Sequence, residues 1–328
     1  MKFAVMTSNV EIAVLRDMAQ AAEGLGLELI TFPDHLAYED ADGALDPHRL
    51  AYSSMILAAM VAESTRTLKF GQLVTNNLMR HPAVTAQAFM TLDRLSNGRL
   101  VAGMGAAWRE LEFTMCGLPY PEVADRMDML EESLQCIRSL WTNERTTFHG
   151  RHYRFDDAVL WPKPVQQPHP PFLLGGFAPK LLRLAAAYAD YLNVFFPMGR
   201  SGHPNMARLN DAVYGEKVRY LRGETLRCGR DRRAVKVCNL LPVVAISESR
   251  TEIDAVRRRM APAWGVAPEL AHTSPHGLIG TPAECAVELE RRARDWEIDL
   301  FMFSCTDPQA LQCWVEQLRP YLSRSQRP

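Results

Sequence analysis

The sequence predicts an α/β fold, a TIM-like (β/α)8 barrel with insertion segments, and three observations lead to it. Short apolar strand candidates alternate with amphipathic helix candidates along the chain. Eight such strand–helix units can be counted. The chain has 328 residues, more than the roughly 250 that are typical of such barrels, which leaves room for insertions. A doubly wound open sheet is the alternative fold. No low-complexity segment or composition shift marks a boundary, so we expect a single domain over residues 1–328.

Each strand candidate is a short, mostly apolar run. The strand candidates are residues 2–6, 28–32, 67–75, 99–105, 171–176, 190–196, 235–247 and 299–305. Helices are expected between them, because apolar residues recur there at helical spacing. The clearest stripes are Ile12, Leu15, Ala19 and Ala22; Val84, Ala88, Leu92 and Leu95; and Leu130, Leu134, Ile137 and Trp141.

Other helices are predicted from their first residues. A helix is expected over about 48–64, and Pro82 suits the first turn of the next one. Another helix begins near Pro179, and Thr281-Pro282 combines a good N-cap with a good first helical residue. The irregular segments should be insertions, and they are 36–47, 142–170, 197–204 and 265–277.

The bulk properties limit the classes of protein to which this chain can belong. The net charge is −1, whereas nucleic-acid and membrane-surface proteins need a basic excess, so we expect neither partner. No apolar run approaches the roughly 18 residues that span a bilayer, and the N-terminus lacks the features of a signal peptide. The seven cysteines are scattered, without a C-x-x-C pair. A reduced, cytoplasmic protein is expected.

Barrel topology indicates where functional residues should lie, because active sites of such barrels occupy the loops after the strands. Asp34 and His35 directly follow the strand candidate 28–32 and Pro33. Histidine titrates near neutrality, and a neighbouring carboxylate favours its charged form, so the two form a candidate proton-transfer or cofactor-polarising pair. The alternative is a capping Asp beside a solvated His.

Two glycine-containing turns also follow strands. In "GMGAAW" (103–108), Trp108 stands where the third glycine of a dinucleotide fingerprint belongs, so that motif fails. The turn either faces a ligand or is a set of small residues at a strand end. In "LLGGFAPK" (173–180), a strand runs into Gly175-Gly176 and a helix begins near Pro179. Backbone amides at a helix start bind phosphate, and Lys180 either adds charge or is solvated. No metal-ligand or G-x-S-x-G pattern is found, so no metal is expected.

Longer segments carry a resemblance to a known family. "RHPAVTAQAFMTLDRLSNGRLVAGMGAAWRELEF" (80–113) resembles the diagnostic core of the luciferase-like monooxygenase superfamily. Residues 148–194 resemble its middle section, and "LIGTPAECAVELERRARDWEIDLFMF" (278–303) resembles its C-terminal section. The segment 197–277 is uninformative.

This resemblance implies a barrel that holds a redox cofactor at its C-terminal face, either the deazaflavin coenzyme F420 or FMN. A bulge with a non-prolyl cis peptide, which maps to Leu73-Val74, would support the cofactor ring. The residues implied to contact the cofactor are Asp34, Leu73, Val74, Thr75, Gly105, Ala106, Gly175, Gly176, Phe177 and Ala178. The last four would offer backbone amides to the cofactor phosphate.

The resemblance also separates the two cofactors. Oxygen-using relatives carry His where this sequence has Asp34, and an Asp-His pair looks like the F420-dependent branch. An F420-dependent oxidoreductase is therefore expected, with hydride moving between deazaflavin C5 and a small organic substrate. Asp34 would polarise the ring and His35 would handle the proton. An FMN-dependent monooxygenase served by a separate flavin reductase is the alternative enzyme, and a non-catalytic flavin-binding relative is a third interpretation.

The resemblance is less specific about substrate and assembly. The sugar-phosphate branch has a proton-donating Glu where Trp108 stands, so that substrate is not expected. Asn77 and Trp108 are the candidate substrate-pocket residues. Glu112 is interpreted as a structural partner of Arg126 or of a neighbouring loop. A homodimer is also expected.

Overall fold

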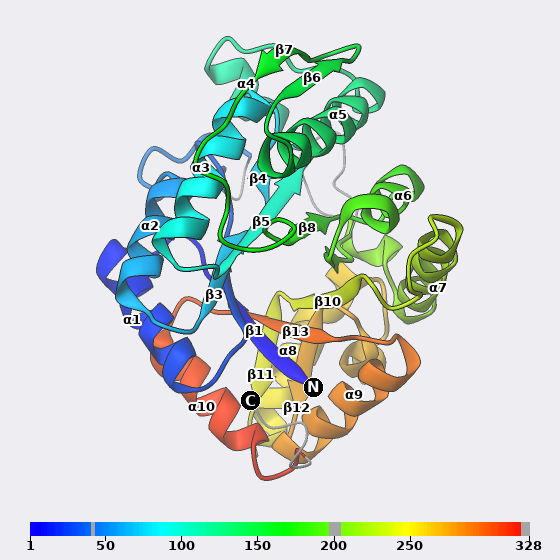
Figure 1. Ribbon diagram of the computed structural model, residues 1–328. Coiled ribbons are helices and arrows are strands. Elements are labelled where there is room, and N and C mark those ends of the chain that lie inside the picture. The colour runs from blue at the N-terminus through cyan, green and yellow to red at the C-terminus, as the bar shows by residue number, and fades with distance from the viewer. Residues whose placement is uncertain (41–42, 197–204, 323–328) are drawn as a thin grey trace.

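The fold is a closed barrel of parallel strands surrounded by helices, as the sequence predicts (Figure 1). It is described from a computed structural model, which covers residues 1–40, 43–196 and 205–322. The predicted insertion 197–204 therefore lies outside the described residues. The barrel strands run in the order β3-β2-β1-β13-β10-β9-β8-β5, and β3 pairs with β5 to close the ring. This closure excludes the doubly wound open sheet.

The strands match the predicted apolar runs closely. The barrel strands are β1 (Lys2–Met6), β2 (Leu29–Phe32), β3 (Lys69–Gln72) with β4 (Thr75–Asn76), β5 (Leu100–Gly105), β8 (Phe172–Gly175), β9 (Tyr191–Asn193), β10 (Lys236–Leu241) and β13 (Leu300–Ser304). Their side chains alternate between two cores, as expected for strands buried on both faces. One core fills the barrel, with Ala4, Leu29, Val101, Leu173 and Met302 among its members. The other lies between the strands and the helices.

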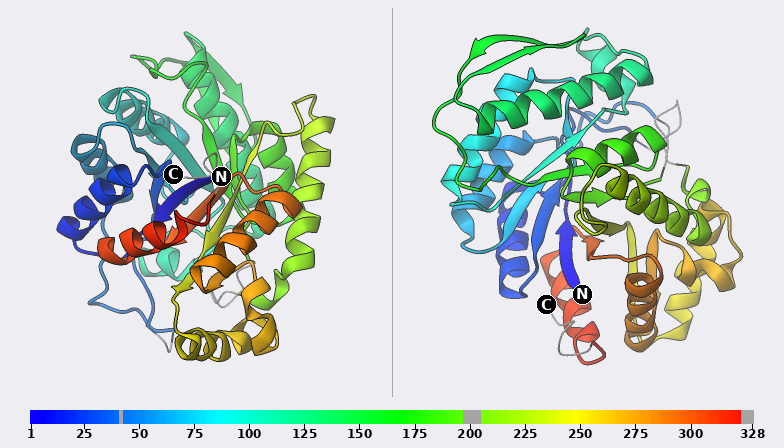
Figure 2. Two further views of the ribbon diagram at one scale, coloured as in Figure 1. Left: turned by 90° about the horizontal axis from the view of Figure 1, so that it is seen from below. Right: turned by 45° about the vertical axis from the view of Figure 1, so that its right-hand side comes forward.

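Helices follow every barrel strand, and Figure 2 shows them arranged around the strands. They are α1 (Ile12–Gly24), α2 (Ser54–Ser64), α3 (Pro82–Leu95), α4 (Glu110–Met115), α5 (Val123–Thr142), α6 (Pro179–Tyr188), α7 (Asp211–Arg227), α8 (Arg250–Trp264), α9 (Pro282–Asp295) and α10 (Pro308–Leu318). Short 3₁₀ helices span Met206–Arg208 and Pro268–Thr273. Thr281 and Glu284 form a reciprocal capping box at the start of α9. The helix expected from about residue 48 begins only at Ser54.

Two predicted strands are interrupted, each for a local reason. The run 235–247 divides into β10 and β11 (Val243–Ile246), and Pro242 between them has no N–H to continue the ladder with β13. β11 leaves the barrel and pairs in parallel with β12 (Gly277–Gly280), a strand at the end of the predicted insertion 265–277. The insertion 142–170 contains an unpredicted hairpin of β6 (Thr146–His149) and β7 (Arg154–Ala158), at the top of Figure 1.

The run 67–75 divides at the bulge that the family resemblance implies. Gly71 pairs with Val101 and Thr75 pairs with Met104, so four steps along β3–β4 oppose three steps along β5. One extra residue in one strand of a pair defines a bulge. The Leu73–Val74 peptide bond is cis. The bulge therefore lies at the C-terminal end of β3, on the face where the loops after the strands gather.

Candidate functional site

The candidate site lies at the C-terminal ends of the barrel strands, where loops after β2, β4, β5 and β8 meet. Val74 is packed between two glycines that belong to different strands. A Cβ on Gly105 would lie 2.2 Å from Val74 Cγ2, and a Cβ on Gly175 would lie 3.5 Å from Val74 Cγ1. Leu73 and Val74 also contact the core inside the barrel. The structure thus brings together four of the residues implied to contact a cofactor.

Asp34 lies in a tight polar network rather than beside the imidazole of His35. Arg80 Nη1 donates to Asp34 Oδ2 at 2.6 Å, and Arg80 Nη2 donates to Oδ1 at 3.2 Å. Ser54 Oγ donates to Oδ1 at 2.6 Å and the Asn76 backbone N–H donates to Oδ2 at 3.0 Å. Through these hydrogen bonds, Asp34 connects the end of β2 to the start of α2, to the strand β4 and to Arg80. Its carboxylate already accepts four hydrogen bonds, which leaves little capacity for another donor.

The carboxylate that contacts the His35 ring is that of Glu112 and not that of its neighbour Asp34. His35 Nδ1 and Glu112 Oε1 are 2.8 Å apart, and the Leu36 backbone N–H donates to the same oxygen at 3.1 Å. The side chain of Glu112 is only 1% exposed, whereas that of His35 is 16% exposed. Consecutive residues in a loop have their side chains directed differently, and here Asp34 and His35 reach separate elements, α2–β4 and α4.

Glu112 was expected to pair with Arg126 or a neighbouring loop, and the loop interpretation is confirmed. Its partners are His35 and Leu36, in the loop after β2. The guanidinium of Arg126 lies instead over the Tyr120 ring, at 4.1 Å from its centroid. Nε and Nη1 of Arg126 have no hydrogen-bond partner. The expected pair of Glu112 with Arg126 is thus wrong.

Aromatic side chains surround the His35 ring. The rings of Tyr38 and Trp108 each meet it edge to face, with centroids 5.3 Å and 5.4 Å away. The Arg109 guanidinium lies over both aromatic rings and donates to the Ala37 carbonyl at 2.9 Å. Burial raises the pKa of Tyr38 to about 12, so its hydroxyl stays protonated. Sequence reasoning found His35 and Trp108 but missed Tyr38, in the loop after β2, and Arg109, at the start of α4, because their contacts depend on how these two segments pack together.

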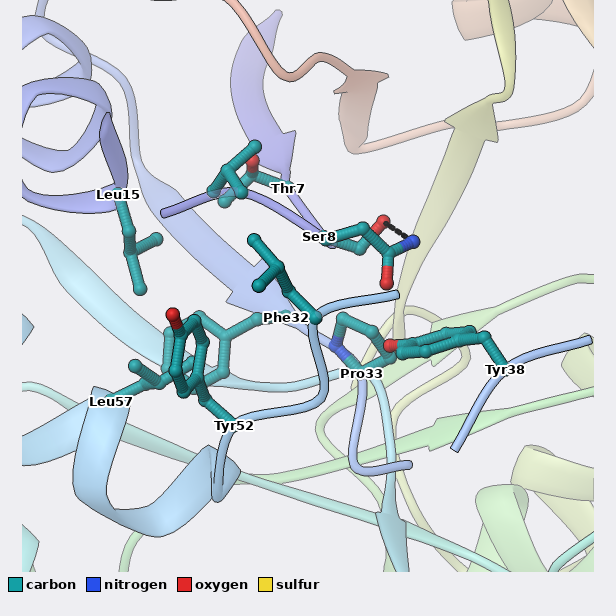
Figure 3. Close-up of a pocket in the computed structure, with 11 residues that line it drawn as sticks. Thr7, Ser8, Leu15, Phe32, Pro33, Tyr38, Tyr52 and Leu57 are labelled. Carbon is teal, nitrogen blue, oxygen red and sulfur yellow. Dashed lines mark hydrogen bonds between the residues drawn. The ribbon is translucent and has the colours of Figure 1, made fainter. Parts of the chain in front are cut away.

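A small pocket of about 30 Å³ lies beside this group, between the ends of β1 and β2 and the helices α1 and α2 (Figure 3). Its walls include Phe32, Pro33, Tyr38 and Tyr52, and none of its lining residues is charged. Tyr38 belongs both to this pocket and to the ring cluster around His35. No local sequence pattern predicts this pocket, because its walls come from segments that are not adjacent in the chain.

At the start of α6, which is predicted as a phosphate site, one of the four expected amide donors is already engaged. The Gly176 backbone N–H donates to the Asn193 carbonyl at 3.0 Å, so this amide is already engaged. Gly176 has φ +143°, and a Cβ there would lie 2.3 Å from Leu181 Cδ2. Ala178, the N-cap of α6, supplies no side-chain acceptor, and Pro179 lacks an N–H. Among the described residues, the amides of Phe177, Ala178, Lys180 and Leu181 at this helix start have no backbone partner, so they remain available to a phosphate.

The remaining candidates have mixed surroundings. Thr75 Oγ1 is fully buried and lacks a hydrogen-bond partner, which costs about 1–3 kcal/mol unless a water or ligand supplies one. Asn77 is 2% exposed; its backbone N–H donates to the Gly105 carbonyl at 3.1 Å, and its side-chain Nδ2 is buried without a hydrogen-bond partner. Lys180 pairs with Asp128 of α5 rather than standing free.

One cluster has the ligand types of a metal site, formed by Asp125, Asp128 and His152. Its carboxylates already have cationic partners. Arg151 contacts Asp125 at 2.9 Å, and Lys180 contacts Asp128. These ion pairs account for the cluster without a metal.

The fold and the site together define a class: a (β/α)8-barrel protein whose bulged third strand and loops at the strand ends form one polar and aromatic site. Comparison with known proteins identifies the family. The family model for luciferase-like monooxygenases matches residues 1–265. The chain belongs to this family. Among the residues that the structure describes, no helix is both long enough and apolar enough to cross a membrane.

Individual relatives carry two cofactors in their names. An F420-dependent glucose-6-phosphate dehydrogenase of Nakamurella multipartita is 36% identical over 176 residues, which are 54% of this chain and 50% of that protein. An FMNH(2)-dependent dimethylsulfone monooxygenase of Pseudomonas putida is 29% identical over 196 residues, which are 60% of this chain and 51% of that protein. The chain spans about half the length of the curated relatives it matches.

Solved structures agree with the fold. An F420-dependent secondary alcohol dehydrogenase in complex with an F420-acetone adduct has a TM-score of 0.77 at 19% identity, over 98% of this chain and 99% of that one. EDTA monooxygenase from Chelativorans sp. BNC1 has a TM-score of 0.79 at 14% identity, over 100% of this chain and 95% of that one. At these identities the likeness concerns the fold alone.

Proposed function

We propose that this protein is an F420-dependent oxidoreductase that moves hydride between deazaflavin C5 and a small organic substrate. The observation that carries the proposal is the adjacent Asp34 and His35 at the end of β2, because the family resemblance of the sequence associates His at this position with the oxygen-using branch. The sequence similarity to an F420-dependent dehydrogenase supports it. The whole chain would act as one domain.

The residues present fit a deazaflavin cofactor. Leu73 and Val74, backed by the close approach of Gly105 and Gly175, would support the ring, and Thr75 Oγ1 is an unpaired hydroxyl next to them. The amides at the start of α6 would hold the phosphate. Ala106, Phe177 and Ala178 lie in the turns beside these groups, and Trp108 would line the substrate pocket.

When bound, the deazaflavin supplies two-electron hydride chemistry. The chain would contribute position and proton handling. His35 Nε2 has no hydrogen-bond partner among the described residues, so it is the atom that can take or return a substrate proton. Asp34 would act mainly by orienting Arg80 and β4 against the ring edge, since its oxygens are already engaged.

Titration of the purified protein with F420 and with FMN tests the cofactor. We expect micromolar binding of F420 and hydride transfer without oxygen uptake. Binding of FMN alone, with oxygen uptake in the presence of reduced flavin, would overturn the proposal. It would favour the second candidate, an FMN-dependent monooxygenase fed by a separate reductase, which the similarity to the dimethylsulfone monooxygenase supports.

His35→Ala tests the role of the imidazole. We expect kcat to fall by about 100-fold or more, because general acid–base groups contribute about that factor. Cofactor affinity should hold. A loss of less than about tenfold, with binding intact, would remove His35 from the mechanism. A cytoplasmic homodimer is part of the same proposal, and sedimentation of the purified protein checks its oligomeric state.

A further inference from the structure

We propose that Glu112 is a positioning residue that holds His35 by its Nδ1–H and thereby makes Nε2 the reactive nitrogen. The proposal rests on the proposed function, in which His35 handles the substrate proton. It assigns a role in the reaction to a carboxylate for which the sequence indicated only a structural one.

The hydrogen bonds determine which ring nitrogen carries the hydrogen. Glu112 Oε1 lies 2.8 Å from His35 Nδ1 and 3.1 Å from the Leu36 backbone nitrogen. A backbone N–H can only donate, so Oε1 is an acceptor in that contact. An oxygen that accepts from one neighbour is best placed to accept from the other as well. Nδ1 therefore carries the hydrogen, and in the neutral ring Nε2 is the atom with a free lone pair.

Packing keeps the ring in this orientation. Tyr38 and Trp108 contact it edge to face from the loop after β2 and the turn after β5. The Arg109 guanidinium packs over both aromatic rings and donates a hydrogen bond to the Ala37 carbonyl in the loop after β2. Glu112 itself is buried in α4. The imidazole thus has one fixed side, which faces Glu112, and one unpartnered nitrogen.

The arrangement also provides a counter-charge for proton transfer. When Nε2 accepts a proton from the substrate, the ring becomes an imidazolium, and a carboxylate hydrogen-bonded to Nδ1–H stabilises it without taking that proton. The charged and titratable groups around the ring are Glu112, Tyr38 and Arg109. Asp34, the residue before His35, forms an ion pair with Arg80. Glu112 is the only one of these described groups that hydrogen-bonds the imidazole.

The first test needs neither cofactor nor substrate. In the wild-type protein, ¹⁵N NMR of labelled histidines reports the tautomer of each ring, and His35→Gln identifies the His35 signal by its loss. We expect the Nδ1–H tautomer in the wild type and a smaller Nδ1–H fraction in Glu112→Gln. Glu110→Gln, at an exposed glutamate of the same helix, should leave the signal unchanged. An Nε2–H tautomer in the wild type would overturn the proposal.

The second test uses the holoenzyme. Glu112→Gln should lower kcat by about 100-fold or more, with KM and cofactor affinity within about threefold of wild type. Glu112→Asp should restore part of kcat, since it keeps the charge. An unchanged kcat, or equal losses in cofactor affinity and kcat, would show a purely structural role. If F420 does not bind at all, the proposed function fails, and the wild-type tautomer still decides the role of Glu112. The same measurement decides it if Glu112→Gln does not fold.

Discussion

At the scale of single residues, the neighbours Asp34 and His35 belong to separate networks with separate partners. Arg80, Ser54 and Asn76 hold Asp34, and Glu112 holds His35. The side chain of Asp34 is 7% exposed and that of Arg80 is 24% exposed. Replacing one partner of such a buried ion pair by a neutral residue lowers the stability of the protein, because the other charge is left without a counter-charge.

Asp34→Asn should therefore destabilise the protein by about 3 kcal/mol, because Arg80 loses its bidentate acceptor. Chemical denaturation followed by circular dichroism measures the change. The matched control is Asp157→Asn, which removes the exposed partner of Arg145 and should cost less than about 1 kcal/mol. Equal effects of the two substitutions would mean that the Asp34–Arg80 pair contributes no more than a surface ion pair.

At the scale of elements, the bulge between β3 and β4 depends on the strand beside it. Gly105 at the end of β5 leaves room for Val74, since a Cβ there would lie 2.2 Å from Val74 Cγ2. The apolar pattern predicts strands over this whole region, but it does not show where a ladder gains a residue. The position of the bulge was available only from the family resemblance, and the structure confirms it through the pairing on either side.

Gly105→Ala should displace Val74 and cost about 1–3 kcal/mol, as overpacking of a filled interior does. Under the proposed function it should also weaken cofactor binding, which a binding titration measures. Gly223→Ala in α7 is the control, because no atom lies within 4 Å of the added Cβ. It should leave binding unchanged and raise stability by up to about 1 kcal/mol. A Gly105→Ala protein with wild-type stability and affinity would contradict this account of the bulge.

At the scale of the whole molecule, the segments inserted around the barrel are stabilised by buried polar groups. Arg292 of α9 is fully buried and donates to the carbonyls of Ser274 and Gly277, which join the insertion to β12. His276 lies in the same region and its Nε2 contacts the Met206 carbonyl at 2.9 Å. Burial lowers the pKa of His276 from 6.5 to about 4, and the nearby Arg292 also lowers it.

Stability should consequently fall as the pH drops from 6.5 towards 4. In that window the unfolded chain binds a proton at residue 276 and the folded protein does not. The loss should total on the order of 3 kcal/mol at about 1.4 kcal/mol per pH unit. Glu23 has a pKa lowered to about 2, so it contributes only below its ordinary value of 4.5.

Denaturation at several pH values measures this dependence. His276→Gln should flatten the curve between pH 6.5 and 4, whereas the exposed His48→Gln should not change its slope. A curve for His276→Gln that parallels the wild type would show that another group is responsible.

The sequence by itself determined the architecture and the edge of the barrel where the site lies. Apolar runs and helical stripes depend on spacing within one segment, and loops after parallel strands always gather at one end. The partners of the site residues were decided only by the tertiary structure. Glu112 is far from His35 in the chain, and their hydrogen bond depends on how α4 packs over the loop after β2. Contacts of this kind depend on the relative placement of whole elements, which no local pattern records.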